Sequence, residues 1–72
     1  MYRLCQWIVG EKKIHEDDVD ETSINSVLDT YESLFNNMGF NPVVSVNSRT
    51  DLPILKIIEN DSLKGTLFFE RV

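Results

Sequence analysis

The sequence predicts an α+β fold, a two-layer sandwich in which one amphipathic helix packs on a four-stranded, mostly antiparallel sheet in the order β-α-β-β-β. Two observations lead to this prediction. In a single segment, apolar residues recur at helical spacing, at positions 24, 27, 28, 31, 34, 35 and 38. Elsewhere they fall in short runs rich in aromatic and β-branched residues, bounded by turn-forming residues, as is typical of strands. A chain of 72 residues has room for one core, so residues 1–72 are expected to form a single domain.

The N-terminal part is predicted as a strand followed by an acidic loop. Residues 2–9, with the sequence YRLCQWIV, are rich in strand-forming types and stop at Gly10. A short helix that ends at this glycine is the alternative. Residues 11–21 are rich in carboxylates and contain only two aliphatic side chains, Ile14 and Val19, so they are expected to form an exposed, mobile loop.

The helix is expected at about residues 21–38. Asp20 is a candidate N-cap because its carboxylate can accept hydrogen bonds from the free amides of the first turn. Val19 and Ile24 stand on either side of it at the spacing of a hydrophobic staple. At the other end, Gly39 can adopt the left-handed conformation that terminates helices.

Three further strands are expected at residues 43–47, 53–59 and 66–72. The linkers between them are short and rich in turn formers, which predicts two consecutive hairpins and therefore an antiparallel meander. The helix must then cross one face of the sheet to join the first strand to the second.

One helix cannot cover both faces of this sheet, because the strands carry apolar residues on both. Alternation along the strands separates residues that can meet the helix (Leu55, Ile57, Leu67 and Phe69) from residues that point the other way (Ile54, Ile58, Phe68 and Trp7). Two interpretations of the second face remain open. Either Ile14 or Val19 folds over it and completes the core, or it is a contact surface for another protein with Trp7, Ile54, Ile58 and Phe68 as anchors.

The charge of the chain bears on the kind of partner. Twelve acidic residues against seven basic ones give a net charge of −5, which disfavours direct binding to nucleic acid and favours proteins with basic surfaces. Glu16, Asp17 and Asp18 are candidates to contact such a surface, including the basic groove of a nucleic-acid-handling protein. The alternative is that they only stabilise the helix terminus and keep the protein soluble. A calcium loop is excluded because Ser23 and Asp29 occupy the positions that require glycine and glutamate.

No residue cluster has the spacing of a catalytic, metal or cofactor site. Cys5 is the single cysteine and is expected to be a buried, inert thiol, while His15 is expected at the surface. The glycines are too far apart for a phosphate-binding loop, and no serine lies in a G-x-S-x-G motif. The apolar run at residues 2–9 is too short to span a membrane. We therefore expect a cytoplasmic protein that is not an enzyme and needs no cofactor or metal.

The sequence thus favours a small acidic protein-binding module that inhibits or modulates a larger protein by occupying its surface. A homodimeric structural or accessory subunit is the alternative. In size and charge the chain resembles many small regulators encoded by phages and mobile elements, a likeness that no motif accompanies.

Overall fold

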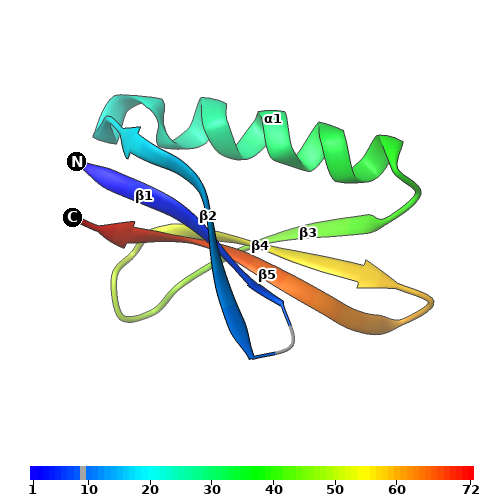
Figure 1. The fold of residues 1–72 in the computed structure, drawn as a ribbon. Coiled ribbons are helices and arrows are strands. Elements are labelled where there is room, and N and C mark those ends of the chain that lie inside the picture. The colour runs from blue at the N-terminus through cyan, green and yellow to red at the C-terminus, as the bar shows by residue number, and fades with distance from the viewer. Residues whose placement is uncertain (9) are drawn as a thin grey trace.

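The computed structural model describes residues 1–8 and 10–72, and in it one helix packs on one face of an antiparallel sheet (Figure 1). The α+β class is confirmed. The elements are β1 (Tyr2–Ile8), β2 (Glu11–Val19), the 3-10 turn η1 (Glu21–Ser23), α1 (Ile24–Asn37), β3 (Asn41–Val46), β4 (Pro53–Glu59) and β5 (Ser62–Arg71). The predicted end of the first strand at Val9 lies outside the described residues.

The predicted number and order of strands were wrong. The sheet has five strands in the spatial order β2-β1-β5-β4-β3, and the chain order is β-β-α-β-β-β. The additional strand, β2, lies where an acidic loop was expected at residues 11–21. β2 is an edge strand with exposed charged side chains, and an edge strand of this kind does not need the apolar alternation by which strands are recognised.

The C-terminal meander was predicted correctly, whereas the pairings of β1 and the connection of α1 to β2 were not predicted. Strands β3, β4 and β5 form the expected antiparallel meander, and β1 pairs with β5 on one side and β2 on the other. Helix α1 joins the edge strand β2 to the edge strand β3 and crosses one whole face of the sheet on its way (Figure 1). The two termini lie side by side, where the amide of Val72 donates to the carbonyl of Met1 at 3.1 Å.

The sequence predicted the C-terminal end of α1 correctly but not the capping of its N-terminal end. At the start, the Asp20 carbonyl accepts a hydrogen bond from the Ser23 amide at 2.9 Å, but the Asp20 side chain makes no capping bond, so the expected carboxylate cap is wrong. The backbone turn of η1 satisfies this amide instead. At the C-terminal end Gly39 has φ 93°, and the Phe40 amide donates back to the Phe35 carbonyl at 3.1 Å, as expected for a glycine-terminated helix.

The core lies between α1 and the sheet. Its buried members are Leu4, Val19, Ile24, Leu28, Leu55, Ile57, Leu67 and Phe69. The four residues of β4 and β5 that were expected to meet the helix are all among them. Val19 also belongs to this core, so it does not fold over the opposite face. The partly buried Tyr31 and Phe35 pack against the same cluster from α1.

Candidate protein-binding surface

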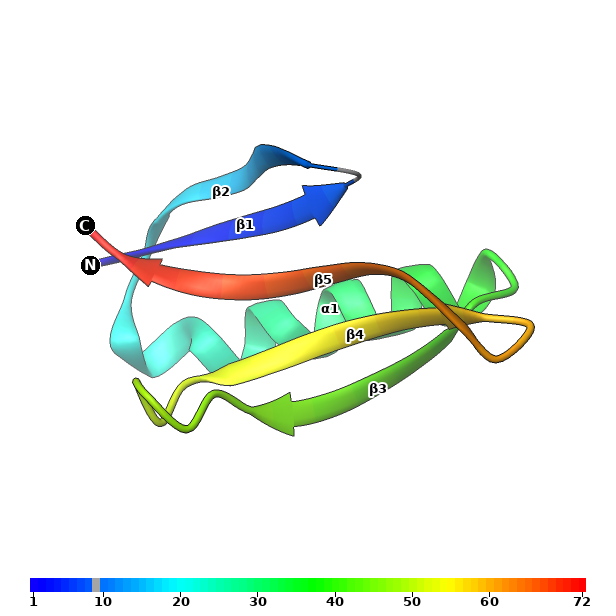
Figure 2. The same ribbon diagram turned by 90° about the horizontal axis from the view of Figure 1, so that it is seen from below.

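The face of the sheet opposite α1 is open. Figure 2 views the molecule from this side: α1 lies behind the strands, and no described helix or strand lies in front of them. The four anchors predicted for this face belong to β1, β4 and β5, and none of them is part of the core cluster or packed against it. These anchors are Trp7, Ile54, Ile58 and Phe68. Ile54, Ile58 and Phe68 are each next in sequence to a core residue, so alternation turns them to the opposite face. Trp7 shares that face because it lies two positions from Cys5, the strand partner of Phe68.

An aromatic pair lies on this open face. The rings of Trp7 on β1 and Phe68 on β5 are stacked, with centroids 6.1 Å apart and an angle of 19° between their planes. The direct partner of Phe68 on β1 is Cys5, so the two rings meet diagonally across the strands. The side chain of Cys5 is fully buried, whereas Trp7 remains 49 % exposed. Trp7 therefore presents a large apolar ring to solvent from β1.

Two further apolar side chains extend the patch: Ile14, which was one of two candidates to fold over this face, and Val43, which was not predicted there. Val43 on β3 is paired with Lys56, and Ile14 on β2 is paired with Cys5, so both share the open face. They are 41 % and 46 % exposed. Their position depends on strand register, which no short-range signal in the sequence specifies.

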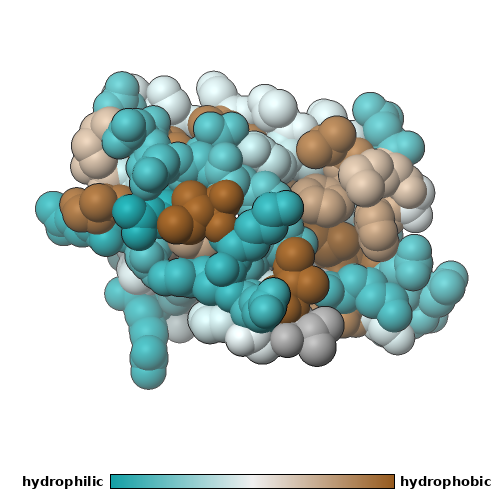
Figure 3. Space-filling model, viewed as in Figure 1, coloured by the Kyte–Doolittle hydropathy of each residue, from teal (hydrophilic) through white to brown (hydrophobic). Residues whose placement is uncertain are grey.

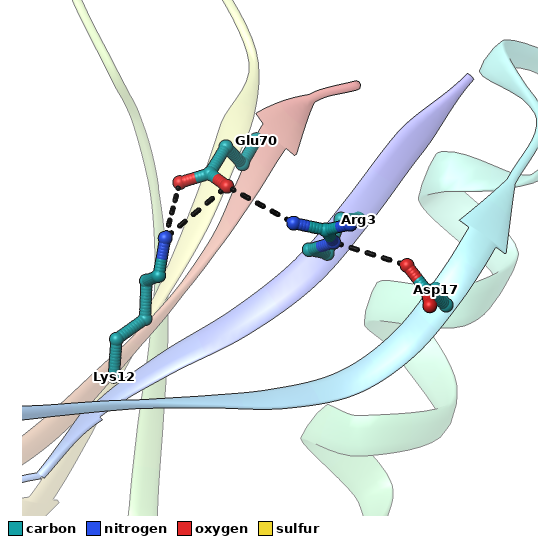
Figure 4. Close-up of polar contacts among 4 residues, drawn as sticks. All are labelled: Arg3, Lys12, Asp17 and Glu70. Atoms are coloured by element: carbon teal, nitrogen blue, oxygen red, sulfur yellow. Dashed lines mark hydrogen bonds and ion pairs between the residues drawn. The ribbon is translucent and has the colours of Figure 1, made fainter.

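A chain of ion pairs lies on the same side of the sheet, at its β2 end (Figure 4). The Arg3 Nε donates to Asp17 Oδ1 at 3.0 Å, and the Arg3 Nη1 lies 3.7 Å from Glu70 Oε1. Lys12 Nζ lies 3.0 Å from the other oxygen of Glu70. The hydrogen bond to Asp17 is the main cause that raises the pKa of Arg3. These four residues give the apolar patch a charged border.

The acidic residues predicted to contact a partner lie on β2, where they also serve the fold. Glu16 accepts a hydrogen bond from the Tyr31 hydroxyl at 3.0 Å, which links β2 to α1. Asp17 accepts the bond from Arg3. Asp18 is exposed and makes no side-chain hydrogen bond or ion pair with the part of the chain that the structure describes. From the β2 side the surface is mainly hydrophilic, and apolar side chains emerge at separate places (Figure 3).

His15 occupies a more enclosed place than the surface position predicted for it. Its Nε2 lies 2.6 Å from Gln6 Oε1, and its ring meets the Tyr31 ring edge to face at 5.4 Å. His15 therefore lies between the sheet and α1 on the covered face. Partial burial, helped by the positive charge of Lys13, lowers the pKa of His15.

The other groups with reactive chemistry include the thiol of Cys5, which is buried. Burial raises the pKa of the Cys5 thiol, with a smaller contribution from Glu70, so the thiol stays protonated and is a poor nucleophile. Among the described residues, His, Cys, Asp and Glu side chains form no group of three that could hold a metal ion. No helix in the described part of the chain is long and apolar enough to cross a membrane.

The cavities formed by the described residues include two on the surface. One, of about 380 Å³, lies at the end of β5 beside the β3–β4 connection and is lined by Tyr2, Thr50, Leu52, Phe68, Phe69, Glu70 and Arg71. The other, of about 220 Å³, lies between α1 and the start of β3 and is lined by Glu32, Ser33, Asn36, Asn41 and Pro42.

No family model, no curated protein and no solved structure matches the chain.

Proposed function

We propose that this protein is a small acidic binding module that inhibits or modulates a larger protein by occupying its surface with the open face of the sheet. One observation carries the proposal: the half-exposed Trp7 stacks on Phe68 on a face that no described element covers. Exposed apolar patches with a polar border are typical of protein interfaces. Tryptophan is also among the residues that most often dominate the binding energy of an interface.

The proposal assigns separate roles to the two parts of the face. The patch around Trp7, Phe68, Ile54 and Ile58 is the apolar centre of the interface. The ion pairs of Arg3 and Glu70 form its border and restrict the partner to one with matching charges. The net charge of −5 favours a partner with a basic surface, such as a protein that handles nucleic acid. No catalytic step and no cofactor belong to this function.

The test begins with affinity capture of the partner and continues with three variants measured by calorimetry. Trp7→Ala and Phe68→Ala are expected to weaken the complex by about tenfold to several hundredfold, as truncation of an interface anchor does. Leu34→Ala is the matched control, because Leu34 on α1 is exposed by the same 49 % as Trp7 but lies on the other side of the molecule. A partner that binds all three variants equally would contradict the proposal.

The second candidate function is a homodimeric accessory subunit. It is favoured by the balance of charges on the open face, where Arg3 and Lys12 are paired with Asp17 and Glu70. Two copies can therefore bring these faces together without concentrating the negative charge of the chain. Light scattering separates the candidates: a dimer that dissociates in Trp7→Ala supports the second, and a monomer at all concentrations excludes it.

A further inference from the structure

The two edges of the sheet differ in a way that bears on binding. β2 forms one edge and carries charged side chains along most of its length, and its pairing with β1 is interrupted by two register shifts. Charges and irregular pairing are the devices by which proteins keep an edge strand from pairing with other chains. β3 forms the other edge, has no charged residue in Asn41–Val46, and pairs with β4 in regular register throughout. The edge at β3 has one such protective residue, Pro42, which has no amide hydrogen to donate, whereas residues 43–46 carry neither a charge, a proline nor a bulge.

The outer side of β3 can accept another extended backbone. β4 occupies its inner side, and no described strand lies on its outer side, as Figure 2 shows at the margin of the sheet. Val43 lies on the open face and Val44, paired with Leu55, on the face toward α1. Both valines are more than 40 % exposed, at 41 % and 48 %. An added strand would thus meet main-chain hydrogen-bonding groups and an apolar side chain on each face.

A polar cavity beside the start of β3 adds chemical selectivity to this edge. It is the cavity of about 220 Å³ between α1 and β3, to which Glu32, Ser33 and Asn36 contribute from the helix and Asn41 and Pro42 from the strand. Glu32 is its only charged lining residue. Because Tyr31, the preceding residue, bonds to Glu16 of β2, Glu32 lies on the flank of α1 away from that strand. The cavity therefore offers oxygen acceptors and one negative charge next to the free edge.

We infer that the outer edge of β3 binds an extended segment of the partner protein whose lysine or arginine side chain enters this cavity and pairs with Glu32. The remaining residues of the segment are uncharged and β-branched or apolar, to match Val43 and Val44. The inference rests on the proposed function only in taking the ligand to be a protein. It adds the site at β3 and the chemistry of the segment bound there.

A second copy of this chain fits the site poorly. β3 of a second copy has no basic residue to offer to Glu32. β2 of a second copy has Lys12 and Lys13, but it would also bring Asp17 and Asp18 against the edge. A contact between β2 of one copy and β3 of the next would moreover extend without closing and would produce filaments.

The experiment uses the full chain and a synthetic acetylated peptide of alternating threonine and valine with one central lysine. Two-dimensional NMR is expected to show saturable shifts at residues 41–46 and slower exchange of the amides on the outer side of β3. Two control peptides have the lysine replaced by glutamine or alternate backbone nitrogens methylated. The first is expected to bind about 1.5-fold to fivefold more weakly, because it loses one exposed ion pair, and the second is expected not to bind.

Two protein variants test the role of the cavity. In Glu32→Gln the lysine peptide is expected to bind no better than the glutamine peptide. Asp29→Asn, an exposed acid on the same helix that does not line the cavity, is the matched control and should keep the preference for lysine. A preference that survives Glu32→Gln would overturn the assignment of the cavity.

Other results would overturn the site itself. These are unshifted amides at residue 41 and residues 43–46 up to millimolar peptide, equal binding of the methylated peptide, shifts confined to β2, or growth of filaments through β3. The failure of the proposed function is distinguishable from these results. If the partner needs Trp7 but leaves the β3 amides unprotected, only the site at β3 is disproved. If the peptide binds at β3 but the partner is insensitive to Trp7→Ala, only the role of the open face is disproved.

Discussion

The two faces of the sheet are built from the same strands and similar residues, yet they have different roles. Leu55 and Leu67 on the helix-covered face are fully buried, whereas their sequence neighbours Ile54 and Phe68 on the open face are only partly buried. Hydrophobicity along β4 therefore does not by itself decide what is core. In β4 the position of α1 decides it, because the helix covers only one face of this strand. On β1, by contrast, Cys5 is fully buried although it lies on the open face. The partly exposed apolar residues of the open face contribute less to folding and are available to a partner.

The largest expected effect comes from removing one side chain from each face of β4. Leu55→Ala should lower the free energy of unfolding by about 2 to 5 kcal/mol, because it leaves a cavity under α1. Ile54→Ala is the matched variant on the adjacent residue and should cost clearly less, since its side chain already contacts water. Urea unfolding followed by circular dichroism measures both. Equal losses would show that the open face is as much a part of the core as the covered one.

A kinetic experiment tests whether β2 contributes charge to the binding surface. Replacing Glu16, Asp17 and Asp18 by their amides should slow association with the captured partner by about threefold to tenfold at low salt, and the deficit should shrink as salt screens the charges. Dissociation should change much less.

The control for this experiment separates an effect of charge on the association rate from an effect on the stability of the fold. Glu16 and Asp17 also bond to Tyr31 and Arg3, so the triple variant should lose some thermal stability. Asp18→Asn alone removes a charge without breaking such a bond and should slow association without changing the melting temperature. Unchanged association of both variants at low salt would show that the charges of β2 do not steer binding.

The covered face should also give the protein a dependence on pH. The pKa of His15 is lowered in the folded state, chiefly by burial, so the unfolded chain binds its proton more readily. The contribution of neutral His15 to stability is therefore fully present above the ordinary histidine pKa of about 6.5 and is lost as pH falls through the lower folded value. Thermal melting at a series of pH values should show this loss in the natural protein and a flatter profile in His15→Gln. Identical profiles would contradict the enclosed position of the ring.

The smallest effect is expected at the charged border of the open face. Glu70→Gln weakens the contacts of Glu70 with Arg3 and Lys12, all three of which are at least partly exposed to solvent. Such pairs contribute little to stability and are screened by salt. The melting temperature should fall slightly at low salt and match that of the unmodified protein at high salt. A loss of stability as large as that expected for Leu55→Ala would show that these ion pairs contribute substantially to the stability of the fold.

The helix and the division of the sheet into two faces were predictable from the sequence, because both depend on short-range patterns. The recurrence of apolar residues every three to four positions specified α1, and Gly39 specified its end, since few other residues tolerate a positive φ there. Alternation in β4 and β5 separated Leu55 and Leu67 from Ile54 and Phe68 before any pairing was known. The four proposed anchors of the open face follow from the same alternation.

Only the tertiary structure decided what depends on contacts between distant segments. β2 was mistaken for a loop because it is exposed and charged, and it becomes a strand by pairing with β1. The same pairing places Ile14 on the open face and brings Arg3 to Asp17, while the pairing of β1 with β5 brings Arg3 to Glu70. The cavity at Glu32 likewise requires the crossing of α1 to β3. Local residue pattern determines which conformation a segment prefers, but register and strand order depend on long-range packing, which short-range patterns do not encode.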